Sequence, residues 1–274
     1  MDRPSLDALI AIALDAGREI MRVREIGFEA MKKGDGSPVT IADQRAEAVI
    51  EKGLHALMPD VPMIGEEAVA EGRVPTCGQR WWCVDPLDGT RDFVAGLSEF
   101  TVNIALIEDG FPVMGVVLLP VSGEMFAGEP GRALKGVYDI HDGRALKPSA
   151  PIHAANGKPT EGWRVFASRR SGAGDATTRF LDAIGPHTRA AASSSLKFCR
   201  LAEGAADLYP RFGDVNEWDA AAGHAVLAAA GGDVMRLDAT PLRYGTKAPD
   251  FLIHGFVAYA NEEAADTTRT ALKH

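Results

Sequence analysis

The sequence predicts a layered α/β sandwich, with strands and helices mixed in both halves of the chain. Apolar residues recur at helical spacing in several segments, and short apolar runs typical of strands lie between these segments. A stretch rich in Pro, Gly and Ala, from Lys147 to Gly162, divides the mixed pattern into two regions. We therefore expect an N-terminal α+β half over residues 1–150 and a C-terminal α/β half over residues 151–274.

In the first half, apolar periodicity predicts a helix from Ser5 to about Arg24 and a second helix from Ile41 to Leu57. Lys32–Pro38, with the sequence KKGDGSP, is expected to be a loop. The strands expected in this half are Val61–Ile64, Trp81–Val84, Thr101–Ile107, Pro112–Leu119 and Glu124–Ala127. Asp109-Gly110 predicts a hairpin between the third and fourth of these strands.

In the second half, the same signals predict alternating strands and helices. The strands expected here are Arg164–Ala167 and Ala205–Tyr209, and the helices are Asp175–Ile184, Ser194–Glu203 and Trp218–Ala230. Gly231-Gly232 is a stop signal for the last helix.

Composition excludes several classes of protein. The chain has 274 residues, of which 46% are hydrophobic and 24% charged, as is typical of a globular protein with a substantial core. Its net charge of −9 argues against a nucleic-acid polymer as partner but not against a small anionic ligand. Three cysteines without a C-x-x-C pair argue against a disulfide framework and a thiolate zinc site.

No apolar run approaches the length of a membrane span, and the N-terminus lacks the features of a signal peptide. We therefore expect a cytoplasmic protein, and peripheral attachment to the cytoplasmic face of the inner membrane stays open. Whether it is a monomer or a homodimer is not determined by the sequence.

The segment Trp81–Phe93, WWCVDPLDGTRDF, carries the strongest chemical signal. The predicted strand ends at Asp85, Asp88 follows three residues later, and the turn leaves through Gly89 and Thr90. Two carboxylates at a strand end can hold hard cations, and a Gly-Thr turn can offer backbone N–H groups to an anion. An isolated D-x-x-D-G is equally well explained as a turn. Its length and the preceding strand favour metal-assisted phosphate chemistry.

Other acids lie at the ends of predicted elements. Glu66 and Glu67 follow a strand and a Gly, so they are either first-turn acids of a helix or part of a site shared with the neighbouring strand. Thr40 and Asp43 form T-x-x-D, which is close to a capping box, and Asp43 is also a candidate to position a water molecule.

Two further acids have similar alternatives. Asp219 at a helix start is either a first-turn acid or a ligand that completes a cation site. Asp35, in the loop before the predicted helix Ile41–Leu57, is a weaker candidate of the same type as Asp43.

The basic groups of the second half are mostly typical of solvated surface. Arg211, in YPRFG, lies between apolar and turn residues, so that an inward-facing role is plausible, whereas His224 is expected to pack or to form a local hydrogen bond. A guanidinium suits bidentate phosphate recognition, and Lys197 can add a second positive charge.

Three motifs in this order resemble a known family. GEE at Gly65–Glu67, DPLDGT at Asp85–Thr90 and WDAAAG at Trp218–Gly223 are similar to the signatures of the inositol monophosphatase superfamily, the lithium-sensitive, magnesium-dependent phosphatases. The resemblance covers nearly the whole chain. It implies an α-β-α-β-α sandwich and a requirement for Mg²⁺.

Within the superfamily the chain most resembles the bacterial 3′(2′),5′-bisphosphate nucleotidases of the CysQ type. The similar segments are KGDGSPVTIAD (Lys33–Asp43), EFTVNIALIEDG (Glu99–Gly110), SSLKFCRLAEGAADLYPRFG (Ser194–Gly213) and AAGHAV in the last predicted helix. Arg211 stands where an acid usually contacts the inositol ring, which suits a substrate with a second phosphate. The chain departs from the pattern at Ser168-Arg169-Arg170-Ser171, where the nucleotidases often have Ser-Arg-Ser-His.

The resemblance also implies roles for single residues. Glu66, Asp85 and the carbonyl of Leu87 would hold one Mg²⁺, and Asp85, Asp88 and Asp219 a second, with a third ion near Glu66. Asp43 and Thr90 would orient the attacking water, so that Asp43, Glu66 and Thr90 are the implied catalytic residues. The implied substrate-binding residues are Glu66, Leu87, Asp88, Gly89, Thr90, Ser168, Arg169, Ser195, Lys197, Arg211 and Asp219.

The function expected is Mg²⁺-dependent hydrolysis of the 3′-phosphate of adenosine 3′,5′-bisphosphate by metal-activated water, yielding AMP and phosphate. By resemblance, this reaction clears a by-product of sulfate assimilation. One alternative is a phosphatase of inositol or sugar phosphates from the same superfamily. A second alternative is a non-catalytic regulator that binds metal or nucleotide.

Overall fold

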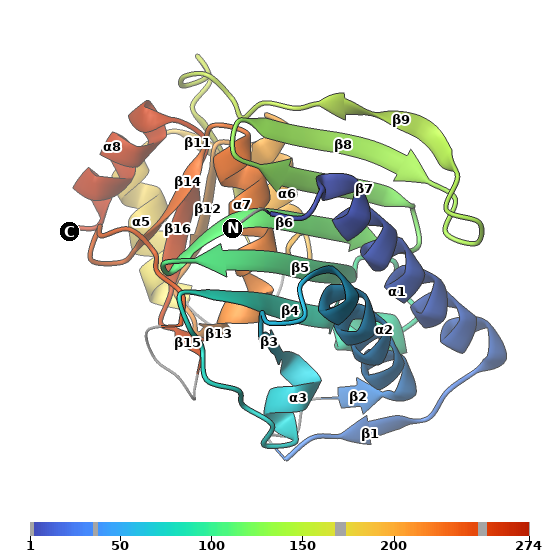
Figure 1. Ribbon diagram of the computed structural model, residues 1–274. Helices are drawn as coiled ribbons and strands as arrows, with labels where there is room; N and C mark the ends of the chain where they lie inside the picture. The colour runs from blue at the N-terminus through green and yellow to red at the C-terminus, as the bar shows by residue number, and fades with distance from the viewer. Residues whose placement is uncertain (1–2, 35–37, 168–173, 246–250, 274) are drawn as a thin grey trace.

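The computed structural model describes residues 3–34, 38–167, 174–245 and 251–273. Two large sheets and three layers of helices are stacked in the order α-β-α-β-α (Figure 1), and the pairs β1-β2 and β13-β15 form two small sheets of their own. The helical layers are α1 (Leu6–Ile26) with α2 (Ile41–Leu57), α6 (Leu196–Ala202) with α7 (Ala221–Ala229), and α5 (Gly174–Ile184) with α8 (Glu262–Ala271). The α6–α7 layer lies between the sheets, so the layered fold expected from the sequence is confirmed.

The first sheet has seven strands in the order β3-β4-β5-β6-β7-β8-β9, and the second has five in the order β11-β10-β12-β16-β14. The strands of the first sheet are β3 (Met63–Gly65), β4 (Arg80–Asp88), β5 (Thr101–Glu108), β6 (Phe111–Leu119), β7 (Glu124–Glu129), β8 (Arg132–Tyr138) and β9 (Ala145–Pro151). Those of the second are β10 (Trp163–Ala167), β11 (His187–Ala191), β12 (Leu208–Arg211), β14 (Asp233–Arg236) and β16 (Phe256–Tyr259). The short elements are β1 (Ala30–Lys32), β2 (Pro38–Thr40), α3 (Glu66–Ala70), α4 (Thr90–Val94), β13 (Val215–Asn216), the 3₁₀ helix η1 (Glu217–Asp219) and β15 (Leu252–Ile253).

Strand β4 shows how the core is divided between the layers. Trp82 and Val84 belong to the core under α1 and α2, whereas Trp81 and Cys83 belong to the core on the α6–α7 side. Successive side chains of a strand point to opposite faces, so a strand covered on both faces must be apolar at every position. This burial explains the continuous apolar run in the sequence.

Several local predictions are confirmed. Ser5 accepts a hydrogen bond from the Ala8 amide and caps α1, and α2 has the bounds expected for it. The hairpin between β5 and β6 turns at Asp109 and Gly110, which have φ angles of 51° and 81°. Two successive positive φ angles are the conformation that Asp-Gly favours in tight hairpins.

The stretch from Lys147 to Gly162, which was expected to divide the two halves, begins within a strand. Lys147–Pro151 lies in β9, which pairs with β8 at the edge of the first sheet. This strand is largely exposed and carries two prolines, so its sequence lacks the alternating pattern of a half-buried strand. Residues 152–162 then connect the first sheet to β10, and the division of the chain into two halves at residue 150 stays a prediction.

Two predicted helices of the second half are shorter in the structure. Helix α6 begins at Leu196 rather than at Ser194, because Ser194 has a φ of 52°, in the left-handed region that ends a helix. The predicted helix Trp218–Ala230 is divided into η1 and α7, because Ala220, with a φ of −116°, separates them.

The predicted strand Ala205–Tyr209 lies further along the chain, at β12. Ala205 is used instead to close α6, because its amide donates to the Arg200 carbonyl. The elements that the sequence analysis did not identify include the longer β8, β9, β11, β14, β16 and α8 and the short β1, β2, α4, β13 and β15. Within the described ranges, no helix combines the length and the apolar character needed to cross a bilayer.

Candidate metal and phosphate site

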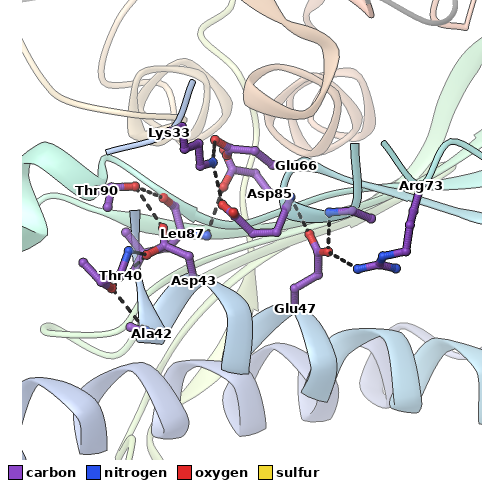
Figure 2. Close-up of polar contacts among 12 residues, drawn as sticks. Lys33, Thr40, Ala42, Asp43, Glu47, Glu66, Arg73, Asp85, Leu87 and Thr90 are labelled. Carbon is purple, nitrogen blue, oxygen red and sulfur yellow. Dashed lines mark hydrogen bonds and ion pairs between the residues drawn. The ribbon is translucent and has the colours of Figure 1, made fainter. Parts of the chain in front are cut away.

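The ends of two parallel strands bring the first acids together. Strand β3 pairs with β4 in parallel, with Gly65 opposite Val84, so that Glu66 and Asp85 leave the sheet at the same edge. Leu87 and Asp88 follow at the end of β4, where the pairing with β5 shifts register between Asp85 and Asp88. Figure 2 shows Glu66 and Asp85 side by side at this edge.

Asp219 comes from the second half of the chain and meets these acids. One carboxylate oxygen each of Asp85, Asp88 and Asp219 lies within 4.8 Å of the others. Asp219 also accepts a hydrogen bond from the Asn216 amide at 3.0 Å, which closes the capping box of η1. Its structural role and its place in the cluster are therefore compatible.

The cluster is electrostatically unfavourable without a cation. Burial, together with the charges of Glu66, Asp88 and Asp219, raises the pKa of Asp85 well above its usual range. Burial also raises the pKa of Asp88 to about 6 and that of Asp219 well above normal. Carboxylates gathered in this way disfavour their charged forms, and a bound cation relieves that cost. The donor set is all oxygen, which fits a hard cation such as Mg²⁺.

Asp43 performs the capping role expected of it and also reaches the site. Its Oδ2 accepts the Thr40 amide at 2.8 Å, and its Oδ1 accepts the Thr90 hydroxyl at 3.0 Å. The Thr90 hydroxyl is also 3.1 Å from the Leu87 carbonyl, and its single proton serves one acceptor at a time. Burial raises the pKa of Asp43, although its hydrogen bonds oppose that shift. Figure 2 shows these contacts.

Lys33 is a member of this region that sequence reasoning did not identify. Its Nζ lies 2.6 Å from both the Glu66 and the Glu67 carboxylates. Burial lowers the pKa of Lys33, but the two carboxylates raise it more, so that the amine stays charged. Burial raises the pKa of Glu67 to about 7. The sequence signal available was the position of Lys33 at the start of the KGDGSPVT segment.

Glu47 was also missed, and it holds the segment that carries Glu66. Its carboxylate accepts the amides of Glu67 at 2.9 Å and Ala68 at 2.8 Å, and so caps α3 from a neighbouring helix (Figure 2). A Cβ on Gly65 would lie 2.4 Å from Glu47 Oε2, so a larger residue there would displace the carboxylate that caps α3. Asp43 and Glu47, four residues apart on α2, face the site together. That spacing was the signal available in the sequence.

A cavity of about 650 Å³ is lined both by carboxylates and by cations. Its acidic group is Glu66, Asp85, Asp88 and Asp219, and its basic group includes Lys197 and Arg211. Lys197 Nζ donates to the Ser194 carbonyl at 2.7 Å and lies 5.0 Å from the centre of the Tyr209 ring. Burial lowers the pKa of Lys197 to about 8, an effect that Asp88 opposes and Arg211 increases. Arg211 is oriented by the carbonyls of Gly213 and Asp214, at 3.2 and 3.0 Å.

The turn after β4 packs closely on the loop before α6. Gly89 has a φ of 96°, and a Cβ there would lie 2.6 Å from Ser194 Oγ, so both its conformation and its surroundings require glycine. Gly89, Thr90, Ser193 and Ser194 line the cavity. Ser195, also expected to contact substrate, is 1% exposed and is not among the residues that line the cavity, and its contact with substrate stays a prediction.

The remaining candidates lie elsewhere. His224 bonds to the Tyr244 hydroxyl at 3.0 Å and to Asp233 at 2.7 Å, which agrees with the structural role expected for it. Asp35, Ser168 and Arg169 lie outside the described residues.

Residues 1–273 of the chain match the inositol monophosphatase family. The chain belongs to that family. It is 42% identical over 253 residues to the 3′(2′),5′-bisphosphate nucleotidase CysQ of Escherichia coli (strain K12), an alignment that covers 92% of this chain and 98% of the relative. It is 34% identical to the protein of the same name from Buchnera aphidicola subsp. Acyrthosiphon pisum (strain APS), with 94% of each chain covered.

Solved structures of the family have the same fold. The crystal structure of CysQ from Bacteroides thetaiotaomicron superposes with a TM-score of 0.73 at 34% identity, and covers 93% of this chain and 97% of that one. An inositol monophosphatase from Anabaena (Nostoc) sp. PCC 7120 gives a TM-score of 0.74 at 23% identity, with 98% and 95% covered. Because the family consists of metal-dependent phosphatases, the acidic cluster is a candidate site for the metal.

Proposed function

We propose that this protein is a 3′(2′),5′-bisphosphate nucleotidase, which hydrolyses the 3′-phosphate of adenosine 3′,5′-bisphosphate to give AMP and phosphate. The observation that carries this proposal is that one cavity is lined both by an acidic group suited to cations and by the basic side chains of Lys197 and Arg211. A substrate with two phosphates can use both groups at once. The relatives of similar length, at up to 42% identity, have the same activity in their names.

The residues proposed to hold Mg²⁺ are Glu66, Asp85, the Leu87 carbonyl, Asp88 and Asp219, in two sites with a third ion near Glu66. When bound, Mg²⁺ supplies the charge neutralisation and the activation of water that attack on a phosphate monoester needs. Lys33 already pairs with Glu66 and Glu67, so we propose that a cation near Glu66 shares that carboxylate with the lysine.

Thr90 and Asp43 are proposed to orient the attacking water. When the Thr90 hydroxyl donates its proton to Asp43, over 3.0 Å, the lone pairs of Oγ1 are left to accept a hydrogen bond from water. Asp43 is itself held by the Thr40 amide, so the pair is fixed before substrate arrives. Such positioning is the main protein contribution to an in-line phosphoryl transfer.

The turn from Leu87 to Thr90 is proposed to receive the scissile phosphate. The first amides of a helix have no acceptors within that helix, and Gly89, Thr90 and Arg91 at the start of α4 line the cavity. The non-scissile phosphate then pairs with Arg211 and Lys197. Ser168 and Arg169 stay proposed substrate contacts.

We also propose Li⁺ inhibition, inhibition by excess Ca²⁺, a cytoplasmic location and a role in sulfate assimilation. Ca²⁺ accepts looser geometry than Mg²⁺ and should occupy the acids without the octahedral arrangement that the reaction requires. The measurement is phosphate release with Mg²⁺ in the presence of each ion.

The test of the proposed function compares kcat/KM for adenosine 3′,5′-bisphosphate, inositol 1-phosphate and fructose 1,6-bisphosphate with Mg²⁺. We expect the nucleotide to be the best substrate. A higher value for inositol 1-phosphate or fructose 1,6-bisphosphate would select the alternative phosphatase function. Release from none of the three would select the non-catalytic regulator. Asp88→Asn protein, purified in parallel, measures any contaminating phosphatase.

A further inference from the structure

Ser195 occupies the N-cap position of α6 but does not cap that helix. A serine at this position normally accepts a hydrogen bond from an amide of the first helical turn, which stabilises the helix. The Ser195 side chain makes no such bond. Its hydroxyl instead donates to the backbone carbonyl of Asp219 at 2.8 Å. The helix gives up a common source of stability, and the hydroxyl is used to hold a residue of the acidic cluster.

The backbone of the same residue holds a second acid of the cluster. The Ser195 amide donates to Asp88 Oδ2 at 2.9 Å, and the Ser195 hydroxyl lies 3.4 Å from that oxygen. Asp88 ends a strand of the first sheet, whereas Asp219 lies on η1 in the second half of the chain. Ser195 is thus hydrogen bonded to one acid from each half.

Ser195 is poorly placed to contact substrate. It is 1% exposed, and the residues that line the cavity next to it are Ser193 and Ser194. A buried hydroxyl whose proton already goes to a protein carbonyl has no free donor for a phosphate. Its position fits a link between the two acids better than a ligand contact.

We propose that Ser195 is a positioning residue, whose hydroxyl sets the distance between Asp219 and Asp88 and so the affinity of the cation that these acids share. This inference rests on the proposed metal site. Metal ligands are usually oriented by hydrogen bonds to the groups around them, and the loss of such a bond weakens metal binding. The bond here is made to the backbone of the ligand residue, so it fixes where η1 lies against the turn after β4.

Ser195→Ala removes the hydroxyl and leaves the amide bond to Asp88 intact. We expect the apparent dissociation constant for Mg²⁺, from thermal unfolding across a Mg²⁺ series, to rise by about three- to tenfold, the size expected for one hydrogen bond. The half-saturating Mg²⁺ concentration for phosphate release should rise by the same factor, and kcat should recover at saturating Mg²⁺. Ser195→Thr, which keeps the hydroxyl, should restore the Mg²⁺ dependence.

Thr268→Val is the matched control, because it removes a fully buried hydroxyl from α8, far along the chain from the site. It should leave the Mg²⁺ dependence unchanged. A higher KM for nucleotide in Ser195→Ala without a change in Mg²⁺ dependence would overturn the proposal in favour of a substrate contact. Lower stability without metal, with unchanged Mg²⁺ affinity, would overturn it in favour of a purely structural role. The thermal unfolding measurement across the Mg²⁺ series needs no substrate. It therefore tests the role of Ser195 even if adenosine 3′,5′-bisphosphate is not hydrolysed.

Discussion

The acidic and basic groups of the cavity are built in different ways. Glu66, Asp85 and Asp88 follow two neighbouring strands of one sheet, so their meeting follows from local pairing. Lys197 and Arg211 come from later in the chain, and they line the same cavity only because the layers pack together. Under the proposed function, the acidic group supplies chemistry common to the family, whereas the basic group distinguishes one phosphorylated substrate from another.

The largest effect should come from a change in the acidic group. Asp88→Asn keeps the shape of the side chain but removes its charge. We therefore expect the transition-state stabilisation, calculated from kcat/KM, to fall by about 3–5 kcal/mol on every substrate. Phosphate release with Mg²⁺ measures this loss, and circular dichroism checks that the variant folds. Turnover close to that of the unchanged protein would mean that Asp88 holds no catalytic metal.

A change in the basic group should affect one substrate only. For adenosine 3′,5′-bisphosphate, Arg211→Ala should lower the transition-state stabilisation, calculated from kcat/KM, by about 2–4 kcal/mol. The cause is the loss of charge-assisted hydrogen bonds in a partly desolvated pocket. Inositol 1-phosphate, which has no second phosphate, should be little affected. Arg189→Ala, an exposed arginine on β11, is the control for a general effect of charge. Equal losses on both substrates would return Arg211 to a structural role.

A smaller effect should come from Glu47, which holds the segment that carries Glu66. Glu47→Gln retains one acceptor oxygen but places an amide group against the other backbone N–H of α3, so Glu66 should be held less well. We expect about 10-fold weaker Mg²⁺ affinity, read from the half-saturating concentration. Glu51→Gln, one turn later and exposed, is the matched control and should behave like the unchanged protein.

The smallest effect should be on stability in the absence of metal. The pKa of Asp88 is raised from 3.8 to about 6, so the folded state binds more protons than the unfolded state between these values. Stability from this group is therefore present at low pH and decreases as the pH rises toward 6. In a chelator, Asp88→Asn should raise the melting temperature relative to the unchanged protein more at pH 7.5 than at pH 4.5. An equal difference at both pH values would argue against a raised pKa.

The sequence by itself determined much of the acidic group. The T-x-x-D pattern gave the start of α2, because a capping box depends on residues three apart. The apolar run and the D-x-x-D-G turn gave the end of β4, because burial on both faces and turn chemistry are local properties. The carboxylates could be named, although their roles as ligands stay proposals.

Only the tertiary structure decided the partners of these groups. Lys33 meets Glu66 across a gap of 33 residues, and Ser195 meets Asp88 across 107. Neither contact leaves a periodic signal, because each depends on how separate layers pack. The break at Ala220 and the short α6 have the same origin: backbone near a site is shaped by long-range hydrogen bonds, which helical periodicity in the sequence does not record.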